Sequence, residues 1–331
     1  MQSIESWLGE RLSPLYEASF SRVKHRLVPS ALKIGSSVAY FSVPLASGVG
    51  SAVLISPAGT EQRASYVPLV IMLHGLGDDC TYPCWHWMHA LVAQGIAVLS
   101  VDWDGHGASV SSHLDVQQAT RSVPLILQKL YGNLGEAGYG TIRPGPDCFL
   151  MGFAAGAALA LMTAARPEMV DLLKGVIAIS PTVILEGTVD SKAELLNCLR
   201  PFSVLHDVVG RISYYGVAGV LPSLSQKRKR NFPLRMRVGS SPGDQMRVFV
   251  NETFQVRKVL RQIQIPVLWM HGRKDHVAPY EKAMELMTEI PSAMFSYVDE
   301  SRGHLRMSLS EDISTYAATF VDSFKKSTHP Y

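Results

Sequence analysis

The chain is poor in cysteine, in net charge and in long apolar runs, and each shortage excludes a class of protein. Four cysteines in 331 residues are too few and too scattered for a disulfide scaffold, so we expect a reducing compartment. A net charge of +3 argues against a nucleic-acid partner. No run reaches the roughly 18 to 20 apolar residues of a membrane span. The first twenty residues also lack the basic and apolar regions of a secretory signal, so we expect a cytoplasmic protein.

Strand-like and helix-like segments alternate along most of the chain. The runs "SVAYFSVPL" and "GSAVLISPAG", with turn residues between them, predict an antiparallel hairpin. From "VPLVIMLHG" onward, apolar strands alternate with helical segments, which predicts an α/β fold with a mostly parallel, doubly wound sheet. In such sheets the loops at the carboxyl ends of the strands form the ligand crevice. We expect helices at 85–94, 115–132, 155–165, 280–289 and 311–325.

Two segments lie outside this repeat. Residues 1–30 place apolar side chains at near-helical spacing and predict an N-terminal helical extension. Residues 186–262 separate two strands, and a structureless loop of that length is implausible in a compact domain. We therefore predict that 186–262 is an inserted, largely apolar helical cap, and that 31–185 and 263–331 together form the core.

The net positive charge of the chain is concentrated in the predicted cap. Residues 200–261 hold twelve Lys or Arg against three Asp or Glu. We interpret the basic run "QKRKR" as a solvated face. The alternative is a weak contact with an anionic membrane surface or an acyl carrier.

The segment "DCFLMGFAAGAALALM", residues 147–162, reads as a buried strand that enters a small-residue helix through a glycine-flanked turn. The turn is spelled Gly152-Phe153-Ala154-Ala155-Gly156. A tight strand-to-helix turn with a strained central residue needs small neighbours. The central residue, Ala154, has no hydroxyl.

With these motifs in this order, the chain resembles the α/β-hydrolases over roughly residues 36–325. "LHGLGD" resembles the oxyanion loop of that family, "DWDGHGAS" the turn after its fourth strand and "GFAAG" its nucleophile elbow. "HGRKDHVAP" and "RGHL" resemble the loops that carry its acid and its histidine.

The resemblance implies roles for individual residues. Ala154 stands at the nucleophile position, Asp275 is the acid that orients a histidine, and His304 is that histidine. Glu186 and Asp190 are fallback acids, because some members of the family take the acid from the preceding strand. The resemblance further implies that the N–H groups of Leu76 and Ala155 form the oxyanion hole, and that the substrate contacts Gly75, Phe153 and Trp85.

The remaining histidines and cysteines point to structural roles. His74, His106 and His271 each lie next to a glycine in a strand-end turn, where we expect hydrogen bonds from side chain to backbone. The spacing of Cys80, Cys84, His86 and His89 matches none of the usual structural zinc sites. We therefore expect no metal and no cofactor.

Because Asp275 and His304 are present although the hydroxyl is not, the sequence favours a serine hydrolase in which a serine has been replaced by Ala154. The expected substrate is a small carboxylic ester with an apolar acyl group. One alternative is a natural non-catalytic pseudo-hydrolase that binds a ligand or a partner. Another is a thioesterase or a carbon–carbon bond hydrolase with the same triad, since fold alone does not identify the substrate.

Overall fold

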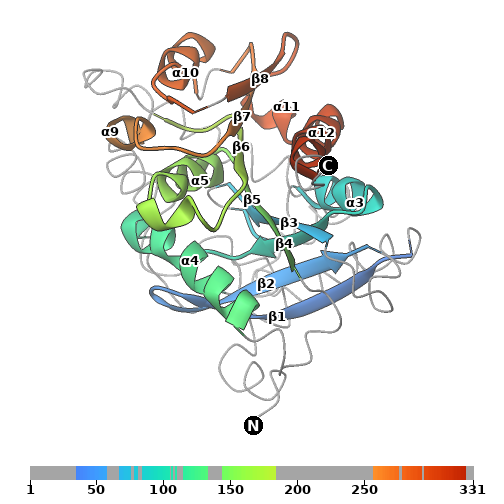
Figure 1. The fold of residues 1–331 in the computed structure, drawn as a ribbon. Helices are drawn as coiled ribbons and strands as arrows, with labels where there is room; N and C mark the ends of the chain where they lie inside the picture. The colour runs from blue at the N-terminus through green and yellow to red at the C-terminus, as the bar shows by residue number, and fades with distance from the viewer. Residues whose placement is uncertain are drawn as a thin grey trace, which may run out of the picture.

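The computed structural model describes residues 35–57, 67–75, 78–80, 84–104, 106, 109, 115–132, 144–183, 256–275, 278–292 and 294–325. Over these ranges the chain forms one eight-stranded sheet with helices on both faces (Figure 1). The predicted N-terminal extension, and the predicted cap from its start to residue 255, lie outside the described residues.

The sheet is antiparallel at one edge and parallel elsewhere. Its strand order is β1-β2-β4-β3-β5-β6-β7-β8. The hairpin of β1 and β2 is confirmed, and β2 also pairs antiparallel with β4, whereas each later pair is parallel. The strands are β1 (Ser37–Leu45), β2 (Gly48–Ser56), β3 (Val67–Leu73), β4 (Ala97–Val101), β5 (Pro144–Phe153), β6 (Gly175–Ile179), β7 (Val267–Gly272) and β8 (Met294–Asp299).

Helices cover the two faces in separate groups, as Figure 1 shows. Buried residues of α4, α5, α9 and α10 join one apolar cluster, and those of α3, α11 and α12 join the other. The doubly wound arrangement predicted from the sequence is therefore confirmed. The helices are α3 (Trp85–Ala93), α4 (Val116–Gly132), α5 (Ala155–Ala164), α9 (Val256–Leu260), α10 (Tyr280–Met287), α11 (His304–Met307) and α12 (Asp312–Lys325), with a short 3₁₀ turn η2 (Pro167–Met169).

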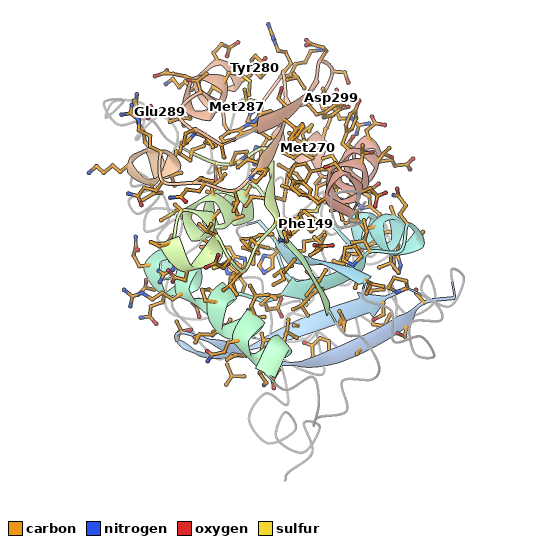
Figure 2. All side chains as sticks on the ribbon, in the orientation of Figure 1. Phe149, Met270, Tyr280, Met287, Glu289 and Asp299 are labelled. Carbon is orange, nitrogen blue, oxygen red and sulfur yellow. The ribbon has the colours of Figure 1, made fainter. Side chains whose placement is uncertain are left out.

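The central strands are apolar on both sides because both faces are covered. Phe149 of β5 and Met270 of β7 are fully buried and lie in the interior (Figure 2). All ten residues of α5 are also buried. At about 25 cal/mol per Å² of apolar surface, this central layer supplies much of the stability that holds the carboxyl ends of the strands in place.

Helix α9 packs on the sheet core although it falls inside the range predicted as a cap. Val256 and Leu260 are fully buried in the same apolar cluster as α5. Arg257 Nε donates to Glu289 Oε1 at 2.6 Å, just after α10, and Glu289 lies beside α9 in Figure 2. The chain has therefore rejoined the core by residue 256.

Among the described residues, no helix has both the length and the apolar character needed to cross a membrane.

Candidate active site

The turn between β5 and α5 holds Ala154 in a backbone conformation that L-residues rarely adopt. Its φ is 52° and its ψ is −114°. The N–H of Ala154 donates to the carbonyl of Ile179 at 2.9 Å, and its own carbonyl accepts from the N–H of Thr182 at 3.3 Å. Both main-chain groups are therefore engaged by the end of β6. Such strain persists only where the surrounding structure over-determines it.

A second strained residue lies next to the first. Ser180, the residue after β6, has φ 45° and is fully buried. Its N–H donates to the carbonyl of Met270 at 2.8 Å. The end of β6 is thus fixed to β7 on one side and to Ala154 on the other, so three neighbouring strand ends form one rigid edge.

The glycines of this turn are required by close packing. A Cβ on Gly152 would lie 2.3 Å from the carbonyl oxygen of Gly156. A Cβ on Gly156 would lie 2.1 Å from the carbonyl oxygen of Leu73. Since real Cβ atoms do not approach oxygen so closely, any other residue would force β5, α5 and β3 apart.

His304 and Asp275 meet at the same edge of the sheet. His304 Nδ1 donates to Asp275 Oδ2 at 2.8 Å, and the exposed fractions of the two residues are 8% and 3%. Asp275 Oδ1 accepts from the N–H of Ala278 at 2.8 Å. Burial acts to raise the pKa of Asp275, but the His304 imidazole and the other hydrogen bonds together hold it below its ordinary value. The carboxylate is therefore charged and fixes the orientation of His304.

The loops that carry this pair approach each other at two glycines. A Cβ on Gly272 would lie 2.4 Å from the carbonyl oxygen of Arg302, and one on Gly303 would lie 2.8 Å from that of Lys274. The N–H of Lys274 also donates to the carbonyl of Arg302 at 3.0 Å. The close contact of the two loops brings together residues that are 29 positions apart.

A second histidine, His271, supports Asp275 from β7. Its Nε2 lies 2.8 Å from the carbonyl oxygen of Ala278 and 3.5 Å from Asp275 Oδ2. On its other side, the indole N–H of Trp269 points to His271 Nδ1 at 3.4 Å. Burial lowers the pKa of His271, so its ring is neutral, with Nε2 as the donor and Nδ1 as the acceptor. Sequence reasoning did not identify this link between His271 and Asp275.

The expected backbone bonds of the three strand-end histidines are confirmed. His74 Nδ1 lies 2.8 Å from the carbonyl oxygen of Gly75. His106 Nδ1 lies 2.8 Å from the carbonyl oxygen of Asp104. His271 Nε2 lies at the same distance, 2.8 Å, from the carbonyl oxygen of Ala278. Burial, followed by the nearby His74, lowers the pKa of His106 to about 3. These histidines are therefore structural and neutral.

The loop after β3 rests on a buried polar and aromatic support. The ring of Trp103 stacks on His106 with centroids 4.3 Å apart, and its N–H lies 3.2 Å from the carbonyl oxygen of His74. Asp102 accepts from Ser51 Oγ at 2.5 Å and from the N–H of Cys80 at 2.7 Å. These bonds join β2 and the turn after β4 to the segment that leads into α3.

Gly75 and Phe153 lie beside Ala154. A Cβ on Gly75 would be 3.5 Å from Phe153 Cδ1 and 3.6 Å from the Cβ of Ala154. The ring of Phe153 is centred 5.6 Å from that of His304. The strained turn and the loop after β3 therefore lie side by side, and Phe153 brings the turn close to the histidine.

Of the two residues predicted to form the oxyanion hole, the structure describes only one. Ala155 is the first residue of α5, and the first N–H groups of a helix have no intrahelical acceptor. Leu76 lies outside the described residues, as do Glu186 and Asp190.

Trp85 lies at the start of α3. Its ring neighbours are His86 and His89, at 5.9 and 6.0 Å. Trp87, two residues on, is the tryptophan whose ring lies near Phe153, at 5.9 Å. A substrate contact by Trp85 therefore remains a prediction.

Within the described ranges, no group of three or more His, Cys, Asp or Glu could hold a metal ion. In this part of the chain, Cys80 and Cys84 are buried and form no disulfide bond. Burial, with a further contribution from Asp78, raises the pKa of Cys84 well above its ordinary value. The thiol is thus protonated.

A family model described as serine aminopeptidase, S33, matches residues 65–301. Among solved structures, the esterase Pf2001 of Pyrococcus furiosus is similar, with a TM-score of 0.60 and 14% identity over 88% of this chain and 95% of that one. An esterase of Exiguobacterium antarcticum has a TM-score of 0.57 and 17% identity, over 85% and 98%. A monoacylglycerol lipase of Paleococcus ferrophilus has a TM-score of 0.51 and 21% identity, over 87% and 98%. No curated protein matches the chain.

Proposed function

The chain belongs to the serine aminopeptidase S33 family of α/β-hydrolases, and on that basis we propose that its site is that of a carboxylic ester hydrolase whose nucleophile is missing. The observation that carries this proposal is the 2.8 Å hydrogen bond between His304 and Asp275, beside a strained turn that has Ala154 at its centre. The alanine removes one oxygen atom and leaves the rest of the site in place.

A serine at position 154 would complete a hydrolytic cycle. Its hydroxyl would attack the ester carbonyl and pass its proton to His304 Nε2, while Asp275 stabilises the imidazolium. The N–H of Ala155 would donate to the oxygen that becomes negatively charged. Water would then release the acyl group by the same steps.

With alanine, the same site holds an acyl compound and does not cleave it through an acyl-enzyme. The similar structures are two esterases and a monoacylglycerol lipase, which supports an ester with an apolar acyl group as the ligand. A non-catalytic role, as a protein that binds such a ligand, is the second candidate, and the alanine itself favours it.

The test is the variant Ala154→Ser. We expect it to react with a fluorophosphonate probe and to hydrolyse p-nitrophenyl esters, whereas the unaltered protein does neither. Ala157→Ser, which places a hydroxyl further along buried α5, is the matched control and should be inert. A well-folded Ala154→Ser protein that neither labels nor cleaves any ester, thioester or amide would contradict the proposal.

A further inference from the structure

The His304–Asp275 pair is complete although it has no hydroxyl to activate. Nδ1 of His304 is engaged by Asp275 at 2.8 Å. Among the described residues, Nε2 of His304 makes no hydrogen bond. Its lone pair is therefore left for a group of the ligand.

The surroundings of His304 bring its ring close to the strained turn after β5. Its ring lies 5.6 Å from Phe153, which directly precedes Ala154. The methyl group of Ala154 can neither accept nor supply a proton. Directly after it, α5 begins at Ala155, whose N–H has no acceptor within the helix.

A base and a donor for a negative oxygen can together promote proton transfer from carbon, a reaction that has no covalent intermediate. We propose that His304, oriented by Asp275, removes an α-proton from a carbonyl compound bound beside Ala154, so that the site catalyses enolisation. This inference rests on the proposed function for the acyl-binding site itself. A hydroxyl at 154 would compete for His304, and alanine removes that competitor.

The step is balanced without any co-reactant. The α C–H bond breaks, its proton moves to His304 Nε2, and its electron pair forms the carbon–carbon double bond of the enolate. The carbonyl oxygen takes the negative charge and accepts the N–H of Ala155, while Asp275 stabilises the imidazolium. Return of the proton to carbon restores the ketone and the neutral histidine. In D₂O each cycle replaces hydrogen by deuterium.

The experiment follows this exchange with 2-decanone, a methyl ketone that has an apolar chain and no bond for a hydrolase to cleave. The unaltered protein is incubated with the ketone in D₂O, and loss of the α-proton signals is followed by ¹H NMR. Binding is measured separately by saturation-transfer difference. We expect exchange about 100-fold faster than with His304→Gln, in the range typical of a positioned general base.

Two further variants make the result decisive. Asp275→Asn should also slow exchange, because the imidazolium loses its partner. If circular dichroism shows that His304→Gln is unfolded, His304→Phe replaces it, since a phenyl ring preserves the contact with Phe153. Free imidazole at the protein concentration sets the background rate.

The outcomes separate this inference from the proposed function. Saturable binding of 2-decanone with equal exchange rates in the unaltered and His304→Gln proteins overturns the inference alone, particularly if Ala154→Ser cleaves esters. Absence of binding, together with an inert Ala154→Ser protein, overturns the proposed function, and the inference falls with it.

Discussion

His304 Nδ1 and Asp275 Oδ2 are 2.8 Å apart, although Asp275 lies in the loop after β7 and His304 begins α11, after β8. The other oxygen of the carboxylate accepts a hydrogen bond from the N–H of Ala278. Asp275 is therefore held at both oxygens before any ligand arrives. If His304 acts as a base, as we propose, this arrangement means that the pair would not have to reorganise during the reaction.

The first prediction concerns Asp275 in the Ala154→Ser background. The change Asp275→Asn leaves the shape of the side chain but removes the charge that stabilises the imidazolium. We expect kcat for p-nitrophenyl esters to fall about 10⁴-fold with little change in KM, measured by steady-state kinetics. Asp312→Asn, at an exposed helix start, is the control and should leave kcat unchanged. Equal kcat values for the two variants would remove Asp275 from the mechanism.

The second prediction concerns His271, which supports Asp275. The change His271→Phe removes the bonds to Trp269 and Ala278 and frees the loop that carries Asp275. In the Ala154→Ser background we expect kcat to fall about 10²-fold, the loss typical of a catalytic group misplaced by about 1 Å. When His271→Phe is made with Ala154 retained, the downfield ¹H NMR signal of His304 Nδ1–H should weaken. If that signal is unchanged in His271→Phe, His271 has no positioning role.

The third prediction concerns packing at the turn after β5. Gly156→Ala places a Cβ against the main chain of β3, which cannot move without distorting the sheet. We expect a loss of about 3 kcal/mol or more in the free energy of unfolding, at the upper end of overpacking. Gly95→Ala is the control: its φ is +81° and nothing lies within 4 Å of the added Cβ. It should cost about 1 kcal/mol from the backbone alone. Urea denaturation measures both, and equal losses would refute the packing argument.

The fourth prediction concerns the buried carboxyl of Asp104, which accepts a hydrogen bond from Ser47 Oγ. Burial raises its pKa from 3.8 to about 6, against the opposing hydrogen bond of Ser47. Between these two values the folded state binds more protons than the unfolded state, so the free energy of unfolding falls as pH rises. The full effect is about 3 kcal/mol, from about 1.4 kcal/mol per pKa unit.

Urea denaturation at pH 4 and pH 7 should therefore show that Asp104→Asn gains stability relative to the unaltered protein as pH rises. The pH dependence isolates the titration from any constant effect of the amide. A difference between the two proteins that is the same at both pH values would exclude a raised pKa for Asp104.

Much of the fold was predictable because its signals are local. The apolar runs of β3, β4, β6 and β7, and the helical periodicity of α4 and α12, depend on burial of one side chain after another. The start of β5 was not predicted. The sequence indicated a buried strand in the segment that starts at residue 147, whereas pairing with β3 begins at Pro144, and the register shifts between Val67 and Leu69. Prolines and glycine at its start read as turn residues, and only the neighbouring strand overrides that preference.

The site was predictable in part for the same reason. Strand ends that carry Ala154, Asp275 and His304 follow from chain order, and the structure brings Asp275 and His304 together. The link from His271 to Ala278 was not predictable, because it depends on how the loop after β7 folds back. Helix α11 has four residues, which is too short for any periodic signal.

The main-chain partners of Ala154 also bear on which residues position 154 can hold. The strained turn is held by bonds to Ile179 and Thr182 that involve no side chain at position 154, so the backbone there does not depend on which small residue is present. Serine codons of the TCN type and alanine codons of the GCN type differ in a single base. One mutational step can therefore add or remove a hydroxyl at position 154 without a change in the main-chain bonds around it.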